Sequence, residues 1–187
     1  MSETSNALIA RLQAKARQYA EGHLRQQGHI PPTLLCETAD KEIMLVLAEL
    51  ENELDNQFGS LARMTCIANT VLGAVFVAQA RMVEDSSGMS AGTQSNASAH
   101  RGQYVLISVE TPGVTVWQRL VPILRADTGT FLGLGEAETP LPESIQRKLP
   151  QFLPLTQPSE TRRELARVFL EMVRLPTSCI RFIGVKR

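Results

Sequence analysis

Residues 104–135 read YVLISVETPGVTVWQRLVPILRADTGTFLGLG, and this stretch decides the fold. It holds three runs rich in apolar and β-branched residues, which are Tyr104–Glu110, Val114–Arg125 and Thr130–Gly135. Thr111-Pro112-Gly113 separates the first two runs, and the sequence ADTG at 126–129 separates the last two; both are turn signals. The stretch therefore predicts a meander of three sequential antiparallel strands.

The first run of the meander alternates, so Val105, Ile107 and Val109 are expected to face inward. Pro122 lies near the end of the second run. Because proline donates no ladder hydrogen bond, it indicates that this end of the strand lies at a sheet edge or a bulge.

A further strand is predicted upstream, over Ala74–Val83. Its two faces are Val75 and Val77 on one side, and Phe76, Ala78 and Ala80 on the other. Both faces are apolar in its first half, which favours a central position in the sheet. Before it, Thr33–Thr38 is strand-like, and 42–50 fits a second strand or a helix with Asp40 as N-cap. We expect a hairpin of two strands here, turning at Thr38-Ala39-Asp40.

Three helices are expected. The N-terminal one has an apolar stripe at helical spacing, namely Leu8, Leu12, Ala16, Tyr19 and His23, and ends at Gly28. The second covers 51–72 and ends at Gly73. The third is capped by Ser159, ends at Pro176 and has Leu165, Phe169, Met172 and Val173 on one face. After it, Cys179–Val185 is apolar enough to add an edge strand.

The order of these elements is α-β-β-α-β-β-β-β-α, which predicts the α+β class: a mostly antiparallel sheet with helices packed on it. We divide the chain into an N-terminal helix (1–30), an α+β core with a mobile loop (31–138), and a proline-rich segment with the C-terminal helix (139–187). All three parts are expected to belong to one domain. The proline-rich part should run extended, with one helical turn over Glu143–Leu149.

Charge is balanced overall but unevenly distributed. The 187 residues include 19 basic and 19 acidic ones, which gives no general attraction to nucleic acid or to an anionic membrane. Residues 37–55 hold seven acidic residues and one lysine, whereas residues 160–187 hold seven basic and three acidic residues. These stretches are either two solvated faces or two patches that meet, within one chain or between neighbouring chains.

Cysteine usage and hydropathy indicate a cytoplasmic protein. Cys36, Cys66 and Cys179 are widely spaced and odd in number, which is not a disulfide framework and suits a reducing compartment. Cys36 and Cys66 are expected to be buried as small hydrophobic residues. The start of the chain lacks the pattern of a signal peptide, and the longest apolar run, Val71–Ala78, is too short to span a membrane.

The polar stretch 86–102, SSGMSAGTQSNASAHRG, holds the one pentapeptide with a catalytic appearance. Gly88–Gly92 matches the G-x-S-x-G pattern, with Ser90 as the nucleophile and His100 downstream. That mechanism needs a strand, a tight turn and a helix beginning at the serine, and the residues after Ser90 are poor helix formers. We therefore interpret the stretch as a mobile connection; a hydrolytic site with Ser90, His100 or Arg101 is the alternative.

Other chemistry-bearing patterns are weak. His23 and His29 belong to no metal-ligand spacing, and the glycines of 129–135 lack the loop-to-helix setting that binds phosphate. No metal or cofactor is expected. Trp117 shares a strand face with Arg119, which fits an interface centre or a core edge. The basic residues of the C-terminal helix are Arg162, Arg163, Arg167 and Arg174.

These observations favour a non-catalytic protein that acts through protein–protein contact, as an oligomer or as a subunit of a complex. One alternative is a small-molecule-binding or hydrolytic enzyme that uses the 86–102 loop. The other is a nucleic-acid-associated protein that binds through its basic C-terminal helix, although its charge and aromatic content are low for that role.

Overall fold

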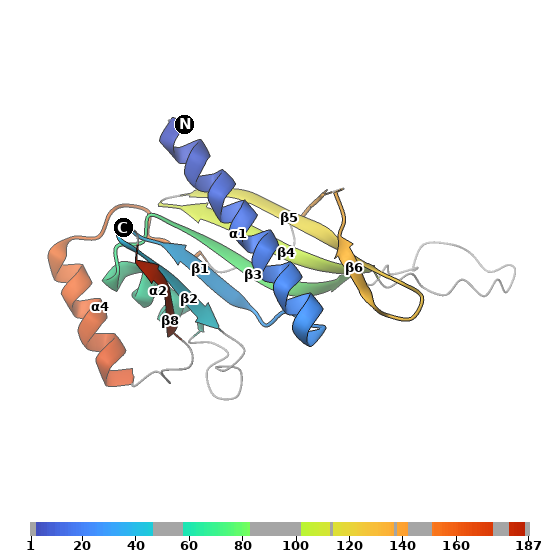
Figure 1. The fold of residues 1–187 in the computed structure, drawn as a ribbon. Coiled ribbons are helices and arrows are strands. Elements are labelled where there is room, and N and C mark those ends of the chain that lie inside the picture. The colour runs from blue at the N-terminus through green and yellow to red at the C-terminus, as the bar shows by residue number, and fades with distance from the viewer. Residues whose placement is uncertain are drawn as a thin grey trace, which may run out of the picture.

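The computed structural model describes residues 3–46, 58–82, 102–112, 114–136, 138–141, 151–173 and 180–185. Within these ranges eight strands form an antiparallel sheet in the order β6-β5-β4-β3-β1-β2-β8, with β7 paired to β5 (Figure 1). The elements are α1 (Glu3–Gln27), β1 (Thr33–Glu37), β2 (Lys41–Val46), α2 (Phe58–Ala68), β3 (Gly73–Met82), β4 (Gly102–Thr111), β5 (Val114–Arg125), β6 (Phe131–Leu134), β7 (Thr139–Pro140), α4 (Glu160–Val173) and β8 (Ile180–Val185). The predicted α+β class is confirmed.

The meander predicted from residues 104–135 is confirmed as β4, β5 and β6, and β3 extends it on the other side. Gly129 has a φ of 82° in the turn between β5 and β6, and its N–H donates to the carbonyl oxygen of Ala126 at 2.8 Å. Pro122 lies between the part of β5 that pairs with β7 and the part that pairs with β6. Pro122 is therefore neither at an edge nor at the bulge, which lies at Leu124 and Arg125. Its carbonyl oxygen accepts from the Gly135 N–H at 2.8 Å, and the donor that proline lacks falls between the two pairings.

The hairpin of β1 and β2 is confirmed, so Lys41–Val46 is a strand and not a helix. The hydroxyl of Thr38 forms the turn: it accepts a hydrogen bond from the Lys41 N–H at 3.0 Å and lies 2.8 Å from a carboxylate oxygen of Asp40. Residues 47–50 of the predicted strand lie outside the described residues. The prediction of a C-terminal edge strand is also confirmed, because β8 pairs with β2 at the end of the sheet.

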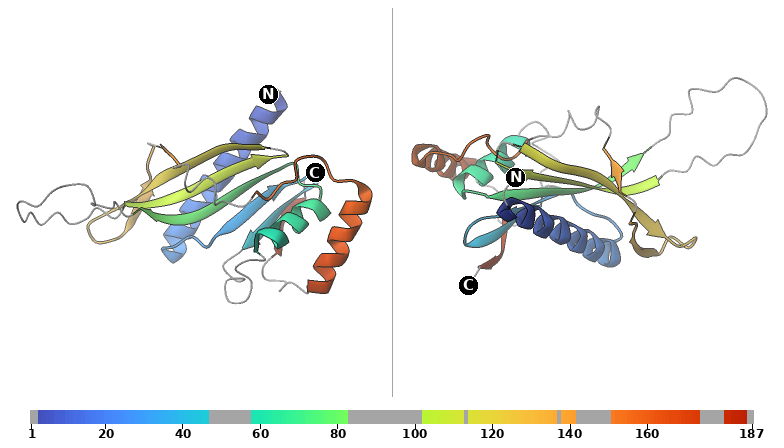
Figure 2. Two further views of the ribbon diagram at one scale, coloured as in Figure 1. Left: turned by 180° about the vertical axis from the view of Figure 1, so that it is seen from behind. Right: turned by 90° about the horizontal axis from the view of Figure 1, so that it is seen from above.

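The sheet is covered on both faces, with α1 on one side and α2 and α4 on the other (Figure 2). The alternation of β3 divides the core as expected. Val75 and Val77 join α1 and the inward residues of β4, whereas Phe76 and Ala78 join α2. Phe152, from the segment before α4, packs 5.6 Å from Phe76 between ring centroids and completes the second core.

The apolar stripe of α1 is only partly as predicted. Leu12 and Ala16 are fully buried, and so are Ala20 and Leu24, which the narrow predicted stripe omitted. His23 does not enter the core; it stacks on Tyr19 with ring centroids 4.3 Å apart. Alanine gives a weak signal in a hydrophobicity pattern, although its small side chain allows a helix to approach a sheet closely.

Two predictions about the remaining helices are wrong. Gly73 does not end α2; the helix ends at Ala68, and Leu72, which was expected within the helix, lies beyond it and is 37% exposed. On α4, Leu165 and Met172 point to solvent, and Ala166 is the fully buried residue. The helical turn predicted at Glu143–Leu149 lies outside the described residues, and so do residues 86–101 of the predicted loop 86–102. Gly102 does not belong to a loop, because it is the first residue of β4.

Candidate functional site

Helix α4 is held against the second core by one side only. Its first turn is capped by Ser159, whose hydroxyl accepts from the Arg162 N–H at 3.4 Å. The residues that pack toward the core are Ala166, Phe169, Leu170 and Val173. This side of the helix rests against α2, and no strand among the described residues lies against the opposite side (Figure 2).

The outer side of α4 is apolar. Leu165, Val168 and Met172 are 65%, 50% and 69% exposed, and their spacing of three and four residues places them on one stripe. We call these three residues the outer face of α4. Glu164 and Glu171 follow this stripe along one flank, seven residues apart. Exposed large apolar residues that form a continuous stripe are typical of protein-binding surfaces, unlike single exposed leucines.

Two of the three arginines of α4, Arg163 and Arg167, are paired within the helix itself. The Arg163 guanidinium contacts the carboxylate of Glu160, and the Arg167 guanidinium contacts that of Glu164. These pairs lower the net charge that the helix presents to a polyanion. Arg174 lies outside the described residues, so the predicted basic face is described only in part.

The acidic and basic stretches of the sequence meet within the chain. Strand β2, from the acidic stretch, pairs with β8 from the basic one. A polar hollow of about 350 Å³ lies between the β1–β2 turn, the end of α2 and α4, and both Asp40 and Arg167 line it. Glu37 and Glu42, however, form their ion pairs with α1 and not with α4.

A strained residue, Thr70, also lines this polar hollow. Its φ of 51° is left-handed, which is rare for a β-branched side chain. The conformation ends α2: the Thr70 N–H donates to Ile67 at 3.2 Å and the Val71 N–H donates to Cys66 at 3.1 Å, as in a Schellman motif. Arg163 donates to the Thr70 hydroxyl at 3.3 Å, while the Arg163 Nε is buried without a partner among the described residues.

A second hollow, of about 300 Å³, lies between α1 and the β1–β2 hairpin. Its lining is mainly apolar, with Leu12 and Leu35, and Lys15 and Glu42 stand at its rim. Beneath them the Glu37 carboxylate is almost fully buried and accepts from Arg11 at 2.8 Å and from Lys15 at 3.3 Å. Lys15 also contacts Glu42 at 2.6 Å, so its ammonium group joins the two carboxylates.

The candidate catalytic residues are not brought together. Ser90, His100 and Arg101 lie outside the described residues. The Nδ1 of His23 is 3.2 Å from the side-chain oxygen of Gln27, and that of His29 is 3.2 Å from the Gln27 backbone oxygen. Neither contacts an acid. In the described part of the chain no three histidines, cysteines or acids are placed to hold a metal ion, and no helix there is long and apolar enough to cross a membrane.

Trp117 occupies the strand face predicted for it. It lies opposite Val109, and the Arg119 guanidinium is 5.7 Å from its ring centroid. The ring is half-buried against the α1 side of the core.

Two buried polar features escaped the sequence analysis. The Glu110 carboxylate accepts hydrogen bonds from the backbone N–H groups of Phe152 and Leu153 at 2.9 and 3.0 Å. Burial raises the pKa of Glu110. The sulfur atoms of Cys36 and Cys66 lie 3.9 Å apart. Burial of both cysteines was predicted and is confirmed, but their contact was not foreseen.

Comparisons with protein-family models, with curated proteins and with solved structures found no match for this chain.

Proposed function

We propose that this protein is a non-catalytic subunit that binds another protein through the outer face of α4. The observation that carries the proposal is the exposure of Leu165, Val168 and Met172 on a helix whose other side is already packed. Helices that dock in a groove of a partner use apolar anchors at this spacing. Such anchors supply most of the binding free energy when they become buried.

The charges beside the stripe support a different protein as partner over a second copy of this chain. A symmetric antiparallel pairing of two α4 helices about Val168 would bring Glu164 of one copy close to Glu171 of the other. Like charges at that position oppose pairing, to the extent that Arg167 leaves Glu164 unneutralised. A partner with an apolar groove and a basic rim fits better, because its charges would complement Glu171.

The alternatives have less support. Two of the arginines that would contact nucleic acid, Arg163 and Arg167, are engaged by glutamates of the same helix. An enzyme built on the 86–102 loop rests on the pentapeptide alone. The hollow beneath α1 is large enough for a small apolar molecule, but its charged rim is already paired internally.

The test compares two variants that carry the same substitution at equally exposed leucines. Leu165→Glu alters the outer face of α4, and Leu132→Glu alters β6, where Leu132 is 64% exposed. Tagged wild-type and variant chains are expressed in the native host, and the proteins that co-purify are quantified by mass spectrometry. We expect Leu165→Glu, but not Leu132→Glu, to lose the associated protein, and the isolated chain to be a monomer by light scattering.

Circular dichroism and thermal unfolding must show that both variants fold. If the two variants retain the same associated proteins in the same amounts as wild type, α4 is not the contact surface. If the isolated wild-type chain is a dimer that Leu165→Glu dissociates, the partner is a second copy and the charge argument is wrong.

A further inference from the structure

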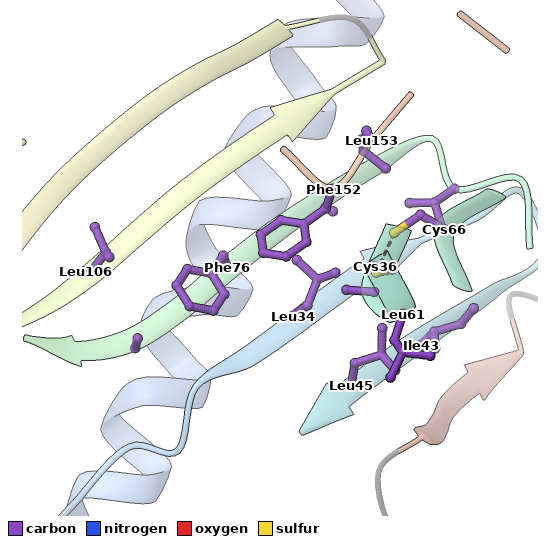
Figure 3. Packing of buried hydrophobic residues seen from close by; sticks show 14 of the residues in the cluster. Leu34, Cys36, Ile43, Leu45, Leu61, Cys66, Phe76, Leu106, Phe152 and Leu153 are labelled. Carbon is purple, nitrogen blue, oxygen red and sulfur yellow. Dashed lines mark hydrogen bonds between the residues drawn. The ribbon is translucent and has the colours of Figure 1, made fainter. Parts of the chain in front are cut away.

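Cys36 and Cys66 form a buried pair of thiols between the sheet and α2. Cys36 lies on β1 and is 3% exposed; Cys66 lies on α2 and is 1% exposed. Their sulfur atoms are 3.9 Å apart although 30 residues separate them in the chain. Figure 3 shows the two sulfurs facing each other across the gap between strand and helix, with Leu34, Leu61 and Phe152 nearby.

Hydrogen bonds hold the backbone at both cysteines. Cys36 is paired with Ile43 on β2 and with Ala74 on β3, so it lies in the interior of the sheet. The carbonyl of Cys66 accepts the N–H of Val71 in the motif that ends α2. A disulfide requires the sulfurs to approach to about 2.05 Å. To close the distance from 3.9 Å, the side chains must rotate and α2 must shift slightly toward the sheet.

We propose that Cys36 and Cys66 are a modification site at which mild oxidation forms a disulfide that joins α2 to the sheet. Hydrogen peroxide is a suitable oxidant, because it accepts the two electrons that the thiols lose and is small enough to enter the core. One thiolate attacks peroxide and becomes a sulfenic acid with release of hydroxide, and the second thiol then displaces the sulfenic oxygen as water. In sum two S–H bonds break, one S–S bond forms, and one peroxide is reduced to two waters.

Burial slows the oxidation of these thiols and restricts it to small oxidants. A hydrogen bond with Cys36, reinforced by burial, raises the pKa of Cys66, so little of its thiolate is present at neutral pH. A large oxidant cannot reach a sulfur that is 1% exposed. The close second thiol, however, traps a sulfenic acid as soon as it forms. The pair should therefore stop at the disulfide, whereas either cysteine alone would proceed to higher oxides.

The disulfide would stabilise the layer that carries α4. It closes a loop of 30 residues that includes β2, and α4 packs against α2. Closing a loop of this length restricts the unfolded chain, which for a domain of this size raises the Tm by about 5–15 °C. This consequence does not depend on the proposed protein-binding role of α4, because it concerns the attachment of α2.

The experiment uses the folded full-length chain with Cys179→Ser, so that the pair contains the two remaining thiols. The protein is treated with hydrogen peroxide, free thiols are alkylated in denaturant, and the peptides are analysed by mass spectrometry. Glutathione in the same tube reports when an accessible thiol is fully oxidised. We expect a peptide cross-linked between Cys36 and Cys66, reversal by dithiothreitol, and the rise in Tm.

The matched control is Cys36→Ser in the same background, for which we expect sulfinic or sulfonic acid at Cys66 and no rise in Tm. Recovery of both thiols in alkylated form after glutathione is exhausted would overturn the proposal. So would a cross-link that forms in urea but not in the folded protein. Because the main measurement needs no substitution at either cysteine, a folding defect in the control does not affect it.

Discussion

Glu110 provides the sharpest test of how the segment before α4 is held to the sheet. Its carboxylate comes from β4, is 3% exposed and accepts two backbone hydrogen bonds, from Phe152 and Leu153. Both donors are themselves buried, with exposed fractions of 1% and 0%. The two substitutions that separate charge from hydrogen bonding are Glu110→Ala and Glu110→Gln.

Glu110→Ala removes the acceptor for both N–H groups. An orphaned buried donor costs about 1–3 kcal/mol, and water that enters the vacated space recovers part of this cost. We expect the free energy of unfolding to fall by about 2–4 kcal/mol. Glu110→Gln keeps an oxygen that can accept both bonds, so it should lose clearly less than the alanine variant at neutral pH.

The pH dependence gives a second measure with a definite sign. Burial raises the pKa of Glu110 in the folded protein above its ordinary value of 4.5. The folded state therefore holds the proton more tightly than the unfolded state. Protonation of Glu110 therefore adds to the free energy of unfolding. This contribution is fully present below pH 4.5 and is lost as the pH rises through the folded-state pKa. Wild type should thus lose stability relative to Glu110→Gln over that window, by at most about 1.4 kcal/mol per pH unit.

Urea unfolding of the three proteins, followed by circular dichroism from pH 4.5 upward, measures both effects. A fixed difference between wild type and Glu110→Gln, such as that from the extra amide donor, shifts the curves but not their slopes. A difference that does not change with pH would refute the argument that Glu110 is desolvated. Equal losses for the alanine and glutamine variants would refute the argument that its hydrogen bonds hold the 152–153 segment.

Three further predictions concern the end of α2, the core beneath α1 and the ion pair between α1 and β1. Thr70→Gly should raise the free energy of unfolding by about 0.5–1 kcal/mol, because glycine adopts the left-handed φ without strain. Thr70→Ala should raise it by less, and the urea midpoints of the two variants measure the difference. Leu12→Ala should cost about 2–5 kcal/mol in chemical unfolding, and Leu124→Ala, at a half-exposed site, under about 1 kcal/mol. Glu37→Gln should lower the free energy of unfolding by about 1–2 kcal/mol. It should also reduce the dependence of stability on salt, because salt screens the ion pair between Glu37 and half-exposed Arg11. Unfolding at low and high NaCl measures both effects.

The sheet was predictable because its signals are local. Turn residues bracket each strand of the meander, and the alternation of β3 assigns Val75 and Phe76 to opposite cores without knowledge of their neighbours. The strand at Lys41–Val46 was also predicted, although its apolar run fits a helix as well. The turn at Thr38 decided between them, since the hairpin it forms places both strands in one ladder.

The polar details of the core were not predictable, because each joins segments far apart in the chain. Glu110 meets Phe152 across 42 residues, and Cys36 meets Cys66 across 30. A glutamate near the end of a strand normally indicates a solvated position, and only the folded path of 151–153 shows that it binds backbone donors. Thr70 could not be predicted for a related reason: left-handed helix ends favour glycine, so the sequence points to Gly73 as the end of α2.

The wrong assignment on α4 and the proposal for its function have the same origin. Its apolar residues cover more than half of the helix circumference, so periodicity alone cannot say which part faces the sheet. Packing selects the side centred on Ala166, whose small side chain allows close approach, and leaves Leu165 and Met172 outside. A helix that needed one buried side would have polar residues at those positions. The fold of this chain uses one side of this wide apolar arc, and our proposal assigns the other side to a partner protein.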